Sequence, residues 1–371
     1  MSESVNEIDL DVLLSEEFED DNEKQALEET TENKNEEQKD IDELLVNPEI
    51  DQEELDDVQK EMFDVIQDTD KSAWEKGEGI KCKFEKLVDV MNGIQSGLGF
   101  VGAQSNMGKS GFLLEVGYSA SKVDDVYSLY FSLDDSARDL LPRIIAADKY
   151  IPINSIRMPE TFLEYPKILK RRKEGIKELY NCINRFKMID QSYGNSIEFI
   201  EETIKRHHNY LKNNDIDKKL FVQIDNFHDI SVQDKNFYDD NDKCEFVAKR
   251  LNMLAEIYKI PIWCTAELRK SANNRRPKMG DIKAATKIGY IAKLCMMCYN
   301  EVSVEKGNSE VYYINEDRPG KSPIFEVAFD KNKLSSFKGT LFYEFIPEYA
   351  LYEECTEEDM EKYNNKVYQN G

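Results

Sequence analysis

The sequence has no long hydrophobic run and no apolar leader. No stretch of the 371 residues approaches the ~18 consecutive apolar residues of a membrane-spanning helix. The N-terminal sequence MSESVNEIDLD has neither the basic start nor the apolar core of a secretory signal. These absences argue against a helical membrane protein and against secretion, so we expect a cytosolic protein.

The first 70 residues lack glycine and contain one proline and two aromatic residues, Phe18 and Phe63. They hold 28 Asp and Glu against four Lys, a net charge of −24 out of −25 for the whole chain. Such a segment has too little apolar surface to offset the entropy of ordering, so we predict an acidic, mostly disordered tail over residues 1–73. Apolar residues recur at helical spacing in 41–46 and 55–66. These segments fit either short helices that form on a partner or a solvated acidic linker.

Cysteine and histidine are scarce, with seven and three residues. An odd number of cysteines, most of them among apolar neighbours, fits a reducing compartment better than a disulfide framework. Cys295 and Cys298 form a CxxC pair in an apolar, strand-like run, but the sequence contains no second pair. A metal or redox role and ordinary core packing are both open for this pair, and packing is the interpretation we favour.

The sequence does contain a near-neutral body, residues 74–345, in which strand-like apolar runs alternate with amphipathic helical segments. We predict strands over 98–102, 126–133, 186–189, 220–224 and 260–265, and β-rich sequence over 294–329. We predict helices over 110–121, 136–149, 196–211 and 244–258. Such alternation predicts an α/β fold with a mostly parallel sheet flanked by helices. Residues 346–371 are expected to form a C-terminal extension.

The most informative segment is Gly99-Phe-Val-Gly-Ala-Gln-Ser-Asn-Met-Gly-Lys-Ser110, in which a predicted strand ends, a loop of small residues turns and a helix starts. This is the context of a P-loop, where backbone N–H groups and a helix N-terminus surround phosphates. Lys109 is expected to reach the β- and γ-phosphate oxygens, and the Ser110 hydroxyl to bind Mg²⁺. The residues predicted to bind the nucleotide are Ala103, which replaces the first glycine of the usual motif, Ser105, Asn106, Met107, Gly108, Lys109 and Ser110.

A P-loop also needs an acidic residue at the end of a second strand to help hold the magnesium ion. The segment Lys219-Leu-Phe-Val-Gln-Ile-Asp225 provides one, with four apolar residues among the five before the aspartate. Taken alone, Asp225 could equally cap the end of a strand. After a P-loop, we predict that Asp225 is a magnesium ligand.

Several spaced motifs over residues 78–340 together resemble the RecA-like ATPase domain of DnaB-type replicative helicases. Residues 102–110 (GAQSNMGKS) are similar to the family's GARPSMGKT loop, 131–134 (FSLD) to its FSLE motif and 224–228 (IDNFH) to its IDYLQ segment. Residues 260–270 (IPIWCTAELRK) are similar to VPVIALSQLNR, and 276–282 (RPKMGDI) to RPMMSDL. Residues 316–321 (EDRPGK) and the strand-like 325–330 resemble the KxRxG turn and the strand after it.

The resemblance implies ATP and Mg²⁺ as cofactors and a role for each of four residues. Asp134 falls on the acid that activates the attacking water, with Asp135 beside it as a rival, and Asp225 falls on the magnesium acid. Glu267 falls on a glutamine that senses the γ-phosphate. Arg318 falls on an arginine finger that reaches the nucleotide of the neighbouring subunit. A finger of this kind implies a ring, expected to be a hexamer.

The departures from the family pattern bear on activity. Asp134 is one methylene shorter than the family's Glu, and Glu267 places a negative charge near an anionic ligand. Glu316 replaces the lysine that accompanies the finger, and the family's EQDAD becomes Gly289-Tyr-Ile-Ala-Lys293. The helical domain that docks primase in the family has no counterpart before residue 74. We therefore expect a phage or mobile-element protein in a bacterial or phage-infected cytoplasm.

Basic residues concentrate in the segment that resembles the family's DNA-binding loops. Residues 269–293 contain eight Lys and Arg against one acid, Asp281, although residues 71–371 as a whole have a net charge of −1. Such an excess favours an anionic partner, and the resemblance implies single-stranded DNA in a ring channel. The predicted DNA-binding residues are Arg275, Arg276, Lys283, Lys287 and Lys293, with Lys278 as a further candidate. A solvated basic loop is the alternative.

These observations lead to an ATP-driven, ring-forming DNA helicase as the leading hypothesis. The alternative from another class is a nucleotide-binding assembly or regulatory protein with weak hydrolysis, which Glu267 and Glu316 favour. A RecA-like recombinase matches the motifs less closely. The acidic tail is expected to occupy the basic channel or to dock on a basic partner such as a loader or another replication protein, unless it serves solubility alone.

Overall fold

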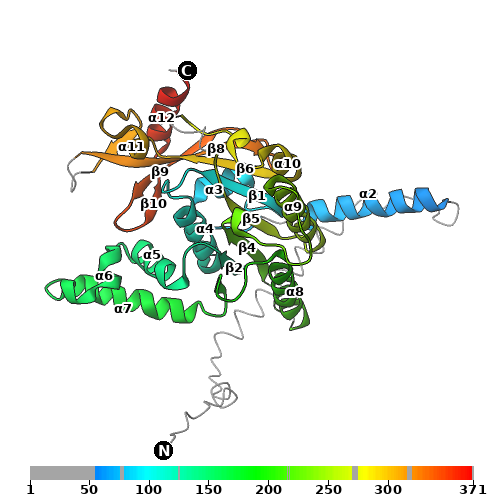
Figure 1. Cartoon of the computed structure of the whole chain (residues 1–371), viewed down its shortest axis with the longest axis horizontal. Coiled ribbons are helices and arrows are strands. Elements are labelled where there is room, and N and C mark those ends of the chain that lie inside the picture. Colours follow the sequence, from blue (N-terminus) through cyan, green and yellow to red (C-terminus); the bar gives the residue numbers. More distant parts are fainter. Residues whose placement is uncertain are drawn as a thin grey trace, which may run out of the picture. The chain divides into compact units, whose positions relative to one another are not determined.

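The computed structural model describes residues 55–75, 79–123, 126–214, 216, 218–269, 275–315 and 320–369 (Figure 1). The chain divides into two compact units, Met1–Gly77 and Glu78–Gly371. The described part of the first unit is helix α2, Asp57–Glu75. Its first turn is closed by a reciprocal pair, because the Asp56 amide donates to Gln59 Oε1 (3.0 Å) and the Gln59 amide donates to Asp56 Oδ1 (2.8 Å). The remainder of the predicted disordered tail, residues 1–54, lies outside the described residues.

The second unit is built on one ten-stranded sheet of order β10-β9-β8-β6-β1-β5-β4-β2-β3, with β7 paired to β8. The strands are β1 (Gly97–Ala103), β2 (Val126–Ser132), β3 (Phe186–Asp190), β4 (Lys219–Asp225), β5 (Pro261–Glu267), β6 (Leu294–Tyr299), β7 (Tyr312–Ile314), β8 (Lys321–Asn332), β9 (Thr340–Ile346) and β10 (Leu351–Glu354). From β3 through β6 all neighbours run parallel, and β7 to β10 pair antiparallel. The predicted α/β fold with a mostly parallel sheet is confirmed.

Helices cover both faces of the sheet (Figure 1). Residues of α8 (Ile197–Asn213), α9 (Asp240–Ile257) and α10 (Ala285–Ile291) belong to one core cluster, and residues of α3 (Glu85–Met91), α4 (Lys109–Val123) and α5 (Ala137–Lys149) belong to the other. The remaining helices are α6 (Ile153–Arg157), α7 (Pro166–Asn181), α11 (Glu301–Glu305) and α12 (Glu357–Gln369). Because the central strands are buried on both sides, they read as continuous apolar runs, which is why the sequence predicted them.

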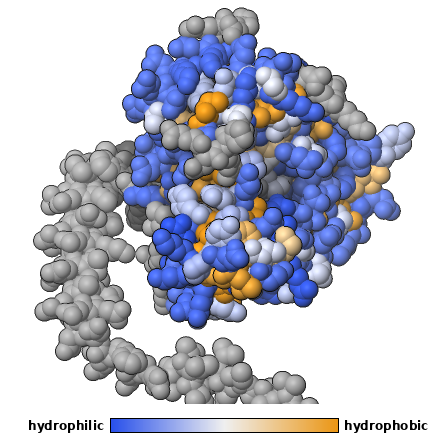
Figure 2. Space-filling model, turned by 90° about the vertical axis from the view of Figure 1, so that its left-hand side faces the viewer, coloured by the Kyte–Doolittle hydropathy of each residue, from blue (hydrophilic) through white to orange (hydrophobic). Residues whose placement is uncertain are grey.

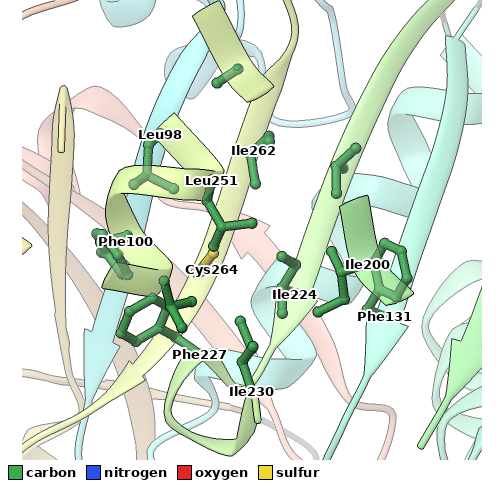
Figure 3. Packing of buried hydrophobic residues seen from close by; sticks show 14 of the residues in the cluster. Leu98, Phe100, Phe131, Ile200, Ile224, Phe227, Ile230, Leu251, Ile262 and Cys264 are labelled. Atoms are coloured by element: carbon green, nitrogen blue, oxygen red, sulfur yellow. The ribbon is translucent and has the colours of Figure 1, made fainter. Parts of the chain in front are cut away.

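Alternate residues of each central strand enter opposite core clusters. In β2, for example, Leu129 and Phe131 enter the cluster that contains α8 and α9, whereas Tyr130 enters the cluster that contains α4. Figure 3 shows the first cluster, where Phe131 and Ile200 lie together and Phe100 lies near Phe227. The same alternation separates Cys295 from Cys298, which belong to different clusters and are both free. The core-packing interpretation of the CxxC pair is therefore the correct one.

The C-terminal extension continues the same sheet. Strand β10 pairs with β9 from Leu351↔Ile346 to Glu354↔Tyr343. Helix α12 buries Tyr363 in a small cluster with Val311, Ile324, Phe342 and Cys355. Residues 346–369 are thus an integral part of the second unit, and β10 packs against α4 and α5.

The face of the unit that carries α6 and α7 mixes charged and apolar surface. Figure 2 shows hydrophobic patches between hydrophilic regions on this side. The exposed apolar side chains in this part of the chain include Met158, Leu163, Tyr165, Tyr180 and Ile183. Within the described residues, no helix combines the length and the apolarity needed to cross a lipid bilayer.

Candidate nucleotide site

The parallel register brings the predicted site residues to one edge of the sheet. Strand β5 lies between β1 and β4, and its last residue, Glu267, is paired with Ala103 at the end of β1. Ser132 at the end of β2 is paired with Asp225 at the end of β4. The P-loop, Glu267, Asp225 and the segment after β2 therefore meet at the carboxyl ends of the strands, where ligands bind in open α/β sheets.

The loop between β1 and α4 has the backbone of a phosphate-binding turn. Asn106 and Gly108 adopt positive φ angles of 64° and 106°, and α4 begins at the next residue, Lys109. Backbone φ angles that alternate in sign along the chain turn successive N–H groups toward one point. Ala103 is not among the positive-φ residues, so alanine is accommodated where the usual motif has glycine. Among the described residues, Lys109 forms no ion pair with a protein carboxylate.

Asp225 is almost fully buried (2% exposed) and is held by three hydroxyl groups. Its Oδ1 accepts hydrogen bonds from Ser110 Oγ (3.1 Å) and from Thr265 Oγ1, and its Oδ2 accepts one from Tyr130 Oη (3.2 Å). Burial raises the pKa of Asp225, while the Thr265 hydroxyl, the nearby Lys109 charge, and Ser110 and Tyr130 oppose that rise. A carboxylate and a serine hydroxyl at this separation are oxygen ligands of the kind that Mg²⁺ takes in proteins.

The two aspartates after β2 differ in their contacts. Asp135 forms an ion pair with Arg143 (3.1 Å). Asp134 is exposed and, among the described residues, forms no ion pair with a basic side chain. Asp229 lies in the turn after β4. Burial raises the pKa of Asp229, and the negative charge of Asp134 raises it further. The Asp134 carboxylate thus acts electrostatically on the same edge of the sheet. Of the two rivals, Asp134 is therefore the one whose carboxylate has no basic partner among the described residues.

Glu267 forms an ion pair with Lys283, which the backbone places beside it. The Lys283 amide donates to the Glu267 carbonyl (3.0 Å), and the Arg269 amide donates to the Asp281 carbonyl (2.8 Å). The hydrogen bond from Lys283 lowers the pKa of Glu267, so the pair is a carboxylate and an ammonium. The Lys109 charge also lowers the pKa of Glu267, and strand pairing places Glu267 beside Ala103 at the start of the P-loop.

His228 joins the same network as a structural residue. Its Nδ1 lies 3.3 Å from the Glu267 amide and its Nε2 lies 3.2 Å from the Lys283 carbonyl. An amide donor at Nδ1 and a carbonyl acceptor at Nε2 fix the neutral tautomer with the proton on Nε2. Burial lowers the pKa of His228, which agrees with that tautomer. His228 thus links the turn after β4 to the end of β5 and to residue 283.

Each predicted DNA-binding residue in the basic segment pairs with an acid. The pairs are Arg275–Asp281 (2.6 Å), Arg276–Glu301 (2.6 Å), Arg276–Glu326 (2.7 Å), Lys283–Glu267, Lys287–Asp242 (2.8 Å), Lys287–Glu245 (2.6 Å) and Lys293–Glu256 (3.0 Å). Acids distant in sequence therefore offset much of the local positive charge. The acids that pair with Arg276, Glu301 and Glu326, are the most deeply buried of these partners, and the Arg276 guanidinium lies over Tyr299.

Sequence reasoning missed two residues that hold Asp225, namely Tyr130 and Thr265. Both lie inside strands that are buried on both faces, and both side chains are fully buried. A polar side chain in a strand that is buried on both faces is the signal that could have identified them, because a buried hydroxyl needs a partner. The predicted finger Arg318 and the substituted Glu316 lie outside the described residues.

The chain is similar in sequence to known replication proteins. The sequence model of the family described as "DnaB-like helicase C terminal domain" matches residues 79–338. A relative named "Probable replicative DNA helicase", from Trieres chinensis, is 23% identical over an alignment of 274 residues, and the match covers 70% of this chain and 57% of that protein. The chain therefore spans little more than half the length of this curated relative.

Two solved structures share the fold, each with a TM-score of 0.66. One is an ATPase domain, 19% identical, and the match covers 81% of this chain and 100% of that chain. The other, described as a DnaB-like replicative helicase and its interactions with primase, is 18% identical, and the match covers 82% of this chain and 68% of that chain. The likeness confirms the predicted RecA-like ATPase fold.

Proposed function

Because the chain belongs to the DnaB-like helicase C-terminal domain family, we propose that it is an ATP-driven motor that acts on single-stranded DNA as a subunit of a ring. The observation that carries this proposal is the P-loop whose Ser110 hydroxyl lies 3.1 Å from the buried Asp225 carboxylate. Backbone N–H groups of residues 105–110 and the Lys109 ammonium would bind the phosphates. Ser110 and Asp225 would hold Mg²⁺, which when bound neutralises charge on the β- and γ-phosphates.

Asp134 is proposed to orient the attacking water. The supporting observation is its exposed carboxylate at the site edge, in contrast to Asp135, which pairs with Arg143. A carboxylate that accepts a hydrogen bond from water directs the water's lone pair toward the γ-phosphate and takes up its proton. Arg318, outside the described residues, remains the proposed finger that stabilises developing charge at the neighbouring subunit's site.

Lys283 is proposed to compensate the charge that Glu267 brings to the site. A glutamate at this position would repel a γ-phosphate, but the ammonium of Lys283 makes the pair neutral overall. The side chains of Glu267 and Lys283 are 35% and 49% exposed, so the ion pair can exchange with other ligands. Departure from the family's glutamine is thus compatible with an active site.

The DNA-binding role is proposed for Arg275, Lys287 and Lys293, whereas Lys283 is proposed to stay paired with Glu267. Lys287 and Lys293 pair with partly or largely exposed acids, whereas Arg275, itself exposed, pairs with the nearly buried Asp281. Exposed pairs contribute only about 0–1 kcal/mol, so a DNA phosphate can replace the protein carboxylate at the two lysines. Arg276 is better explained as a structural residue. If its guanidinium moved to a DNA phosphate, the nearly buried carboxylates of Glu301 and Glu326 would lose their ion-pair partner.

The alternative, a nucleotide-binding assembly protein with weak hydrolysis, is favoured by one observation, the Glu267 carboxylate beside Ala103 at the start of the P-loop. ATP turnover with and without single-stranded DNA separates the two functions. A motor is expected to hydrolyse ATP faster with DNA, and Lys109→Ala is expected to abolish turnover in both conditions. Nucleotide binding without DNA-stimulated turnover in the full chain would reject the motor and support the assembly protein.

The neighbouring aspartates provide a matched pair of variants in the same assay. Asp134→Asn is expected to lower kcat by about 100-fold while nucleotide binding persists, because it removes the proposed base but no phosphate ligand. Asp135→Asn breaks only a partly exposed ion pair and is expected to stay within about two-fold of the unmodified chain. The reverse result would assign the role to Asp135.

A further inference from the structure

Tyr352, in the C-terminal strand β10, reaches the P-loop from 244 residues away. Its side chain is 1% exposed and packs against the rings of Phe112, Phe325 and Phe345, with centroid distances of 5.7, 5.0 and 4.6 Å. The hydroxyl donates a hydrogen bond to the carbonyl of Gly108 (2.7 Å). A strand of the C-terminal extension thus contacts the peptide that precedes Lys109.

The tyrosine hydroxyl and the conformation of Gly108 fit each other. Gly108 has a φ of 106°, and a Cβ atom at this position would lie 2.4 Å from Tyr352 Oη. The Gly108 carbonyl also accepts the hydrogen bond from the Phe112 amide (3.0 Å) that begins α4. Two donors therefore hold this one carbonyl, and they fix the orientation of the peptide between Gly108 and Lys109.

Strand β10 is anchored a second time, further along the same helix. The Tyr352 amide donates to Glu115 Oε2 (3.2 Å), and the other carboxylate oxygen of Glu115 pairs with Lys83 (2.5 Å). The hydroxyl of Tyr352 therefore contacts the P-loop at Gly108, and its backbone amide contacts α4 at Glu115. This double attachment leaves the hydroxyl little freedom to move away from Gly108.

We propose that Tyr352 is a positioning residue of the nucleotide site. It acts through the Gly108–Lys109 peptide, whose orientation decides where the loop amides and the Lys109 side chain point. Holding the loop in its phosphate-binding shape before the ligand arrives removes an ordering cost from binding. The inference rests on the proposed function only in that the P-loop binds a nucleoside triphosphate.

Tyr343 provides a matched control. It lies in the neighbouring strand β9, is 1% exposed and packs against Phe84 and Phe112 in the same core cluster. Among the described residues, its hydroxyl has no hydrogen-bond partner. Tyr352→Phe and Tyr343→Phe therefore each delete one buried hydroxyl from the same aromatic cluster, and only the first deletes a bond to the P-loop.

The experiment measures the Kd of a fluorescent, non-hydrolysable ATP analogue with Mg²⁺ for the full chain and both variants. Loss of one hydrogen bond is expected to weaken binding by about three- to ten-fold in Tyr352→Phe. Tyr343→Phe is expected to bind like the unmodified chain. Equal binding by all three proteins, or equal weakening in both variants, would overturn the proposal.

Amide exchange in the nucleotide-free protein gives a second readout, independent of turnover. Tyr352→Phe is expected to exchange faster than Tyr343→Phe over residues 104–110, and equal rates would overturn the inference. The inference requires only that the P-loop binds a nucleotide, and a failure of that requirement is distinguishable, because the unmodified chain would then not bind the analogue at all. A failure of the motor function alone would leave binding by the unmodified chain intact. Binding is normalised to the folded fraction, so a loss of folding in one variant does not imitate a loss of affinity.

Discussion

Glu267 and Lys283 are two residues whose substitutions we expect to have opposite effects. Glu267→Gln removes a carboxylate near Lys109 and releases Lys283, so the Kd for a Mg²⁺–ATP analogue should fall by about two- to five-fold. Lys283→Met leaves the Glu267 charge uncompensated, and the Kd should rise by a similar factor. A fluorescence titration of the full chain measures both values.

The double variant tests whether the two side chains act as a pair. If the ion pair is responsible, Glu267→Gln combined with Lys283→Met should bind more nearly like the unmodified chain than the lysine variant does. Shifts of both single variants in the same direction would show that the compensation we propose does not occur.

The candidate site was partly predictable because some of its residues belong to a local sequence pattern. Gly108, Lys109 and Ser110 form a motif between a strand and a helix, and Asp225 ends an apolar run. Tyr352 has no such pattern, because its partner Gly108 is 244 residues away. The pairing of Arg276 with Glu326 spans 50 residues, so the sequence showed Arg276 only as positive charge. Contacts of this kind depend on the fold and are absent from any local window.

Helix α4 and strand β10 meet at a buried acid, and that junction should depend on pH. Burial raises the pKa of Glu115 from 4.5 to about 7, against the opposing effect of Lys83. The folded state then binds the proton more tightly than the unfolded state. The stability from this group is fully present below about pH 4.5 and is lost as the pH rises through about 7.

Glu115→Gln should therefore flatten the pH dependence of unfolding. Between about pH 5 and about pH 8 the free energy of unfolding of the unmodified chain should fall by about 1 to 3 kcal/mol more than that of the variant. Urea denaturation at the two pH values measures this difference. Glu85→Gln, which removes an exposed acid, is the control. Parallel pH curves for the unmodified chain and Glu115→Gln would contradict the prediction.

Some strands of the sheet can be predicted from the sequence and others cannot, and the difference has a physical cause. Strands β1, β2, β4 and β5 are buried on both faces, so their apolar runs stand out. Strand β10 has only four residues, two of them glutamates, and it becomes a strand because β9 pairs with it. Such a segment has no periodicity long enough to identify, which is why residues 346–371 were expected only as an extension.

At the scale of the whole molecule, negative charge is concentrated in the N-terminal segment. Residues 1–54 carry 22 acidic and three basic residues, whereas the body from residue 71 has a net charge of −1. In the body, the cations proposed for DNA are already paired with acids. DNA bound as proposed would compete with protein carboxylates for these cations and would approach a chain with a strongly acidic segment. Both effects would weaken DNA binding, and both are electrostatic.

Replacing residues 1–54 by an uncharged sequence of equal length should strengthen binding to single-stranded DNA at low ionic strength. We expect the Kd for a labelled oligonucleotide to fall by about three- to ten-fold at about 0.05 M salt and by less than about two-fold at about 0.5 M, because salt screens long-range repulsion. Fluorescence anisotropy measures both values, and equal length in the two chains separates charge from excluded volume. A difference that persists at high salt would show that the segment occupies the DNA-binding surface through contacts other than charge. No difference at either salt concentration would leave the segment without a role in DNA binding.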